Sequence, residues 1–214
     1  MVAHYHLVLR ENARAGLTGI REPAAVAVKH FLDSLTGLLV CEIARHDRVA
    51  DIGSGAGFPG LVLAVVRPAA RYHLLEATRR KAAFLAAAVE ALALRNVEIV
   101  PSRAEEAGRD DRYREACDLV VSRAVAPLPV MLEYGLPLTR LGGRLIAYKG
   151  PGAERELADS GAALEVLGGE VRELRAVSLP REMGERVLVL VEKTSPTPPA
   201  YPRRPGIPAK RPIG

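Results

Sequence analysis

The chain has little cysteine and no long apolar segment. Its 214 residues include two cysteines, Cys41 and Cys117, which lie far apart and lack the spacing of a metal site. This scarcity excludes a disulfide scaffold and indicates a reducing compartment. No run approaches the ~18 apolar residues of a membrane span, and residues 1–6 lack the order of a secretory signal. We therefore expect a cytoplasmic protein with no membrane contact and no metal site.

Acidic residues are absent from the end of the chain. Residues 195–214 hold four basic side chains, and they also hold seven of the 16 prolines. The formal net charge is +5, so the rest of the chain is close to neutral, at about +1. A basic segment indicates either a polyanionic partner or a solvated tail that aids solubility, and charge alone does not separate the two. The prolines predict an extended tail outside any sheet.

The composition fits one globular domain. Hydrophobic residues make up 49% of the chain and charged residues 26%, and 214 residues are too few for two full α/β domains. We divide the chain into a helical segment over residues 1–46, a core over 47–194 and the tail over 195–214.

The sequence VADIGSGAGFPG at residues 49–60 carries the most information about function. Alternate glycines permit a sharp turn and a close approach to a ligand, and a proline suits the first turn of a helix. The motif predicts a strand, a tight loop and a helix whose exposed N-terminus favours an anionic group. Gly55, Gly57 and Gly60 match the G-x-G-x-x-G spacing of a dinucleotide site. Read from Asp51, the same loop gives the D-x-G-x-G-x-G of S-adenosylmethionine (SAM) methyltransferases, which we favour without excluding NAD.

Glu76 is a candidate for binding the ribose of either cofactor. It ends the second predicted strand and lies 23 residues after Gly53, near the ~20 expected of such a unit. The alternative role is an acid at the start of the next helix, beside Thr78. The glycine loop upstream favours the ribose role.

Apolar runs alternate with helical patterns along the core. The expected strands cover 48–52, 72–75, 97–100, 117–121, 143–148, 171–177 and 186–191, and the expected helices cover 24–39, 59–66, 78–94, 128–138 and 153–167. This order predicts a mostly parallel seven-stranded sheet with helices on both faces. The last two strands have no helix between them and should be antiparallel, as in Rossmann-like methyltransferases. That ending favours SAM.

The helix over 24–39 places three polar residues on one face. His30, Asp33 and Ser34 are three and four residues apart. We interpret them as a polar group on the helix surface, since one histidine and one aspartate supply too few ligands for a metal.

The end of the fourth strand reads SRAVAP at residues 122–127. It has neither the acid or asparagine followed by Pro-Pro of amino-group methylation nor the cysteine nucleophile of pyrimidine C5 methylation. Here the chain resembles the bacterial 16S rRNA (guanine-N7) methyltransferase family, also called the RsmG or glucose-inhibited division protein B family. The matching segments are LTGIR at 17–21, HFLDS at 30–34, DIGSGAGFPG at 51–60, SRAE at 102–105, SRA at 122–124, KG at 149–150 and YPRRPGIP at 201–208.

The resemblance implies a fold, a cofactor and site residues. The fold is a Rossmann-like SAM-dependent methyltransferase, and the substrate is 16S rRNA or the small ribosomal subunit, methylated at guanine N7 in a decoding-region loop. The cofactor-binding residues that it implies are Gly53, Ser54, Gly55, Phe58, Glu76, Ala77, Thr78, Ala104, Glu105 and Arg123. Arg123 is also the candidate for orienting the guanine. The amino terminus is short for the family, and Gly16 replaces the asparagine of its usual Asn-Leu-Thr.

Guanine N7 carries a free lone pair, so its methylation is a direct in-line displacement that needs alignment and no general base. The candidate RNA contacts are Lys29, His30, Lys149, Arg203, Arg204, Lys210 and Arg211. We expect a monomer. The alternatives are a nicotinamide-dependent oxidoreductase, for which no catalytic set is visible, and a SAM-sensing or assembly protein without turnover.

Overall fold

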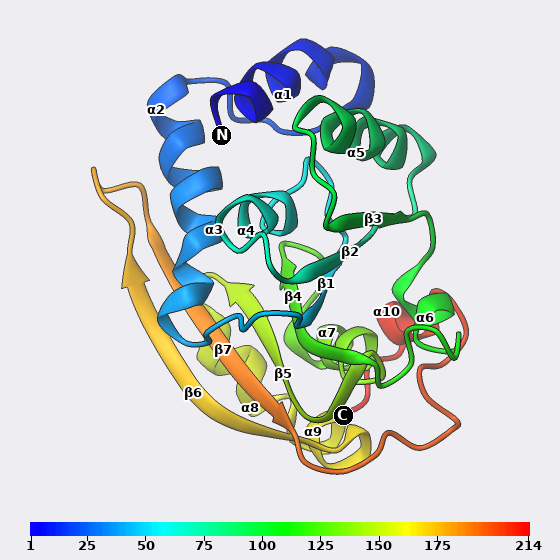
Figure 1. The fold of residues 1–214 in the computed structure, drawn as a ribbon. Coiled ribbons are helices and arrows are strands. Elements are labelled where there is room, and N and C mark those ends of the chain that lie inside the picture. The colour runs from blue at the N-terminus through cyan, green and yellow to red at the C-terminus, as the bar shows by residue number, and fades with distance from the viewer.

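A seven-stranded sheet forms the centre of the computed structural model, which describes residues 1–214 (Figure 1). Across the sheet the strands follow the order β3-β2-β1-β4-β5-β7-β6. Strands β1 to β5 run parallel, and β7 is antiparallel to both β5 and β6. The strands are β1 (Arg48–Ile52), β2 (Arg71–Leu75), β3 (Val97–Val100), β4 (Cys117–Arg123), β5 (Thr139–Lys149), β6 (Gly169–Ser178) and β7 (Glu185–Lys193). The Rossmann-like sheet with an antiparallel ending is therefore confirmed.

The helices form two layers, one on each face of the sheet (Figure 1). Successive side chains of a strand point to opposite faces, so Val49 belongs to one core cluster and Ala50 to the other. The first cluster takes side chains from α1 (Val2–Ala15), α2 (Pro23–Val26), the π-helix η1 (Ala27–Leu32), α4 (Gly60–Val66) and α5 (Arg79–Ala91). The second takes them from α6 (Ala104–Ala107), α7 (Leu128–Gly135), α8 (Ala153–Ala158) and α9 (Gly161–Leu167).

Two of the predicted helices are interrupted. The helix expected over 24–39 is a succession of α2, η1, α3 (Asp33–Leu35) and the 3₁₀ turn η2 (Thr36–Leu39). The helix expected over 153–167 breaks between α8 and α9. The spacing of apolar residues does not reveal the widened π-helical turn of η1, because that turn moves the apolar stripe around the helix by less than one residue position. π-Helical turns occur frequently at functional sites, and η1 carries Lys29 and His30.

The last segment of the chain lies outside the sheet. After β7 it runs as a loop with turns at 199–200 and 205–206 and reaches α6 and α7, where it forms the short helix α10 (Ile207–Lys210) (Figure 1). None of the helices combines the length and apolar character needed to span a membrane.

Candidate functional site

The loop between β1 and α4 turns through glycines in the left-handed region. Gly53, Gly55 and Gly57 have φ angles of 67°, 56° and 88°. A Cβ atom at Gly53 would lie 2.6 Å from Cγ2 of Val125, so only glycine fits there. At Gly55 a Cβ atom would meet nothing nearer than 3.7 Å, so this part of the loop faces open space.

The N-terminus of α4 is not the exposed anion site that the motif predicts. The Gly60 N–H donates to Oδ2 of Asp51 at 2.9 Å, and the Leu61 N–H donates to the Gly57 carbonyl at 2.9 Å. Gly60 is buried, and a Cβ atom there would lie 2.6 Å from the same Asp51 oxygen. A dinucleotide site presents such N–H groups to its pyrophosphate. Here they are used internally, which weighs against NAD and fits SAM, a cofactor without phosphate.

Asp51 is buried behind this loop. Burial raises the pKa of Asp51 to about 7, against the opposing effect of the Gly60 N–H, and its Oδ1 has no hydrogen-bond partner. This acid is the first residue of the D-x-G-x-G-x-G motif. Its observed contact is with the helix that follows the loop.

Glu76 connects the glycine loop to the start of α5. Its Oε2 accepts from the Gly55 N–H at 3.0 Å, and its Oε1 accepts from the Thr78 N–H at 2.7 Å. Thr78 is the N-cap residue of α5. Glu76 therefore contacts the start of this helix, as its alternative role predicts. Each carboxylate oxygen retains acceptor capacity for a further donor, which leaves the ribose role open.

Two cavities meet at Gly53. The larger, of about 500 Å³, lies between η1 and the ends of β4 and β5, and the smaller, of about 190 Å³, lies between β2, α6 and α7. Of the predicted residues, the larger cavity is lined by Lys29, His30, Gly53, Ser54, Gly55, Phe58, Arg123 and Lys149. The smaller is lined by Gly53, Ala77, Ala104 and Glu105. The structure therefore gathers most of the predicted site at the carboxyl edge of the parallel strands, where ligands bind in such folds.

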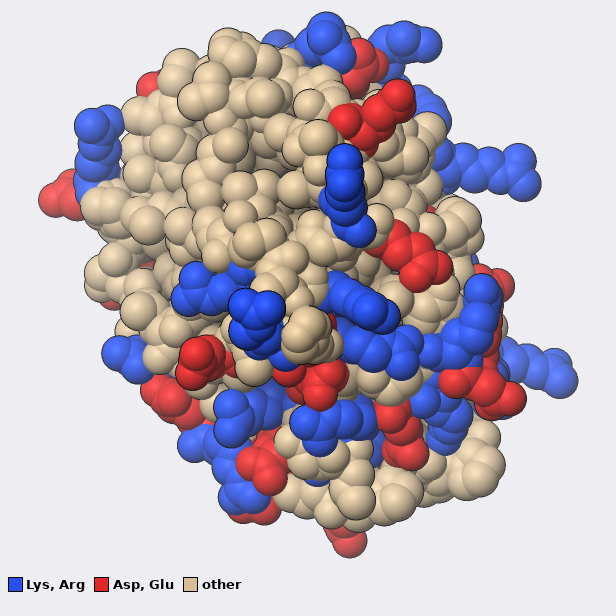
Figure 2. All heavy atoms as spheres, in the orientation of Figure 1, with Lys and Arg blue, Asp and Glu red and all other residues tan.

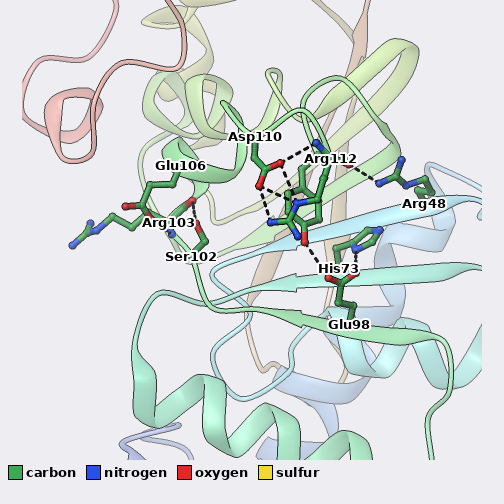
Figure 3. Close-up of polar contacts among 9 residues, drawn as sticks. Arg48, His73, Glu98, Ser102, Arg103, Glu106, Asp110 and Arg112 are labelled. Carbon is green, nitrogen blue, oxygen red and sulfur yellow. Dashed lines mark hydrogen bonds and ion pairs between the residues drawn. The ribbon is translucent and has the colours of Figure 1, made fainter.

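The wall of the smaller cavity is fixed at the start of α6 (Figure 3). The Glu106 carboxylate accepts from the Arg103 N–H at 3.0 Å and from Oγ of Ser102 at 3.1 Å. This capping contact sets the first turn of the helix, which presents Ala104 and Glu105 to the cavity.

Phe58, which lines the larger cavity, stacks with two imidazole rings. The centroids of the His4 and His30 rings are each 4.7 Å from the Phe58 centroid, with interplanar angles of 20° and 18°. Burial lowers the pKa of both histidines to about 4, so both rings are neutral at pH 7. The Arg123 guanidinium lies 5.5 Å from the same Phe58 centroid.

Asp33 is wrongly interpreted as a surface residue from the sequence. Its side chain is fully buried, and Ser34 is buried beside it. Oδ2 accepts from Nη1 of Arg123 at 2.8 Å, and Oδ1 accepts from Nε of Arg186 at 2.7 Å. The helix face is polar because it covers two guanidinium groups, and Arg123 also donates to the Lys29 carbonyl at 3.2 Å.

Of the seven predicted RNA contacts, Lys29, His30 and Lys149 line the larger cavity, and the four tail residues line neither cavity. Nζ of Lys149 donates to the Ala126 carbonyl at 2.6 Å and pairs with Glu156 at 2.6 Å, so this lysine forms part of the cavity wall. Arg203 is half-buried in an ion pair with Glu133. The remaining tail residues, Arg204, Lys210 and Arg211, are exposed and line neither cavity.

Sequence reasoning missed Arg186, Tyr148 and Tyr134. Arg186 and Tyr148 line the larger cavity, and Tyr134 lines the smaller one. The position of Arg186 could have been inferred from the predicted antiparallel last strand. Such a strand begins at the edge of the sheet where the parallel strands end, which is the edge that carries the site. Arg186 stands at the start of β7, and the next residue, Val187, pairs with Lys149.

Comparisons with known proteins bear on this arrangement. The family model described as "GidB: rRNA small subunit methyltransferase G" matches residues 1–184. The chain belongs to this family. Ribosomal RNA small subunit methyltransferase G of Moorella thermoacetica is 46% identical over 211 residues, covering 99% of this chain and 88% of that protein. The protein of the same name from Roseiflexus castenholzii is 46% identical over 215 residues, covering 99% and 90%.

Solved structures support the fold. The 16S rRNA N2 methyltransferase RsmC of Thermus thermophilus, in complex with AdoMet and guanosine, has a TM-score of 0.52 at 24% identity, covering 80% of this chain and 42% of that one. A SAM-dependent O-methyltransferase of Thermotoga maritima has a TM-score of 0.59 at 17% identity, covering 89% and 72%. The family resemblance expected from the sequence is thus confirmed, and the fold is that of Rossmann-like SAM methyltransferases.

Proposed function

We propose that the protein transfers a methyl group from SAM to N7 of a guanine in 16S rRNA, in a decoding-region loop of the small ribosomal subunit. The observation that carries the proposal is the pair of cavities joined at Gly53, in a chain of the rRNA small subunit methyltransferase G family. The internally satisfied start of α4 supports SAM as the cofactor.

The smaller cavity suits the adenosine end of SAM. Ala77, Ala104 and Glu105 line it, and the Glu76 carboxylate, which follows β2, would accept from the ribose hydroxyls. In the larger cavity, Gly53 and the remaining loop residues Ser54, Gly55 and Phe58 would hold the methionine end. When bound, SAM supplies an electrophilic methyl group, whose transfer to the N7 lone pair breaks the carbon–sulfur bond, leaves a thioether and moves the positive charge to the purine.

The groups that line the larger cavity support a reaction without a general base. His30 is a weak base, since burial lowers its pKa to about 4. The Asp33 carboxylate is held by two arginines, and that of Glu156 by Lys149 and the Leu128 N–H. Each potential proton acceptor is therefore engaged, while Arg123 is fixed at the wall where it orients the guanine.

The guanine has to leave its stack to enter the cavity, so we propose that a looped or splayed segment is bound. Lys29 at the cavity and the exposed tail residues Arg204, Lys210 and Arg211 are the proposed phosphate contacts. On the face drawn in Figure 2, basic and acidic side chains are intermixed over the lower half. We therefore expect a few individual phosphate contacts on this face in place of a broad basic field.

The test is incubation of the protein with labelled SAM and small ribosomal subunits or 16S rRNA, followed by digestion to nucleosides. We expect labelled 7-methylguanosine. SAM binding without any methylated nucleoside would instead indicate a sensor or assembly protein, and binding of NAD in place of SAM would overturn the cofactor assignment.

The pH dependence tests the absence of a base. We expect the single-turnover rate of methyl transfer to change little between pH ~6 and ~8. Asp51 titrates in this interval but lines neither cavity, so the outcome that would contradict the base-free mechanism is a tenfold change that follows the titration of a group lining the larger cavity.

A further inference from the structure

The tail is fastened to α7, beside the smaller cavity, by an ion pair whose carboxylate is buried. Nε of Arg203 donates to Oε1 of Glu133 at 2.9 Å, and Nη2 donates to Oε2 at 2.6 Å. The Arg203 backbone N–H donates to the same Oε1 at 2.8 Å. The Glu133 side chain is fully buried. With a further contact of 3.1 Å from Nε to Oε2, four charge-assisted hydrogen bonds at one buried carboxylate make a stable attachment.

Two further arginines hold the tail backbone ahead of this pair. Nε of Arg109 donates to the carbonyl of Pro202 at 2.8 Å, and the guanidinium of Arg114 donates to the carbonyls of Tyr201 and Thr197, both at 2.8 Å. Carbonyl oxygens are thus bound at several points along the segment. Although the prolines exclude it from the sheet, its path is determined by these contacts.

The attached segment reaches the proposed adenine site. The Gly206 N–H donates to Oε1 of Glu105 at 2.9 Å, and this is the only hydrogen bond to the Glu105 carboxylate in the structure. Glu105 is 2% exposed. On the other wall, Tyr134 lines the same cavity and follows Glu133, which holds Arg203. Figure 1 shows the two short helices, α10 and α6, side by side at this point.

We propose that the tail is a positioning element of the cofactor site. The Arg203–Glu133 pair holds the turn at Gly206, and the Gly206 amide fixes the rotamer of the Glu105 carboxylate against the adenine. This inference rests on the proposed function, because it assigns Glu105 to SAM. The proposal gives two neighbouring basic residues of the tail different roles. Arg203 positions the cofactor site through Glu133, whereas Arg204 is exposed.

Two substitutions test the inference in the full-length chain. Arg203→Ala removes the ion pair, and Arg204→Ala removes the neighbouring exposed arginine as its matched control. Arg203→Ala leaves the buried Glu133 carboxylate without its ion-pair partner and lowers stability. Gly206→Ala therefore provides a second variant, which disturbs the contact with Glu105 and keeps that ion pair. Gly206 has a φ of 81° and no atom within 4 Å of an added Cβ, so this change strains the turn without a clash. Gly142→Ala, at a φ of 72° in β5, applies similar strain away from both cavities.

The readouts are the Kd of SAM, the Kd of methylthioadenosine, which carries the adenosine half alone, and the thermal midpoint without ligand. We expect Arg203→Ala and Gly206→Ala to weaken both ligands about tenfold, as for the loss of one charge-assisted hydrogen bond. Arg204→Ala and Gly142→Ala should stay within about twofold of the unaltered chain.

Unchanged affinity in both test variants, even with a lowered thermal midpoint, would show that the tail only stabilises the fold and would overturn the inference. Equal weakening by Gly142→Ala would do the same, since the effect would then be general strain. If the unaltered chain bound no SAM, the proposed function would fail and this inference with it.

Discussion

Replacing Asp33 by asparagine should destabilise the protein through the two arginines that it holds. The side chains of Arg123 and Arg186 are 11% and 23% exposed, and that of Asp33 is fully buried. Removing one partner from a buried ion pair costs about 3–5 kcal/mol. Asparagine retains one acceptor oxygen, so we take the lower end, about 3 kcal/mol. For a chain of this size that loss lowers the thermal midpoint by roughly 6–12 °C.

The measurement is calorimetric or spectroscopic unfolding of Asp33→Asn beside Asp111→Asn. Asp111 is exposed and makes no ion pair, so its substitution should change the free energy of unfolding by less than about 0.5 kcal/mol. A double variant that adds Arg186→Met should lose less stability than the sum of the single changes, because the two side chains are coupled. Equal midpoints for Asp33→Asn and Asp111→Asn would refute the reasoning.

Three further outcomes are expected. The pKa of His4 is about 4 in the folded protein, against 6.5 for an unperturbed histidine. Between these two pH values the unfolded chain therefore binds more protons than the folded protein, and the free energy of unfolding falls on acidification. The contribution of His4 to this loss should be about 2 kcal/mol from pH 7 to 5, so the loss measured by urea unfolding should be smaller by that amount in His4→Phe; equal losses in the two proteins would contradict this. Gly53→Ala should raise the Kd of SAM at least about tenfold while Gly142→Ala does not, because the added Cβ meets Val125 and the φ is positive; wild-type affinity would argue against the loop as the SAM site. Arg204→Ala should weaken rRNA binding and reduce the salt slope by roughly 0.7–0.9, and an unchanged slope would remove it from the RNA contacts.

The strands could be predicted closely because apolar runs between turn residues are local signals. The bounds expected for β1 and β3 are those observed, and the antiparallel ending followed from the short link between the last two strands. The glycine loop was recognisable for the same reason, since its spacing lies within twelve consecutive residues.

Contacts between distant residues could not be predicted in this way. Arg186 and Asp33 are separated by 153 positions, and although the antiparallel ending indicates that Arg186 lies near the site, nothing in the sequence pairs it with Asp33. Arg203 and Arg204 are adjacent and chemically identical, and only the fold places Glu133 beside the first. The start of α4 was predicted to be open because the motif does not show that Asp51 accepts from the Gly60 N–H.

The buried acids of the site all hold the backbone or side chains of other segments. Asp51 binds the start of α4, Glu76 joins the glycine loop to α5, and Asp33 holds the arginines of β4 and β7. Glu133 and Glu105 attach the tail. A reaction that moved a proton would require an acid at the cavity wall that is free to exchange it, and Asp51, whose Oδ1 has no hydrogen-bond partner, lines neither cavity. Methyl transfer to a nitrogen lone pair requires only that the two reactants be aligned. Because the carboxylates fix the segments around the cavities, they hold the side chains that align the reactants.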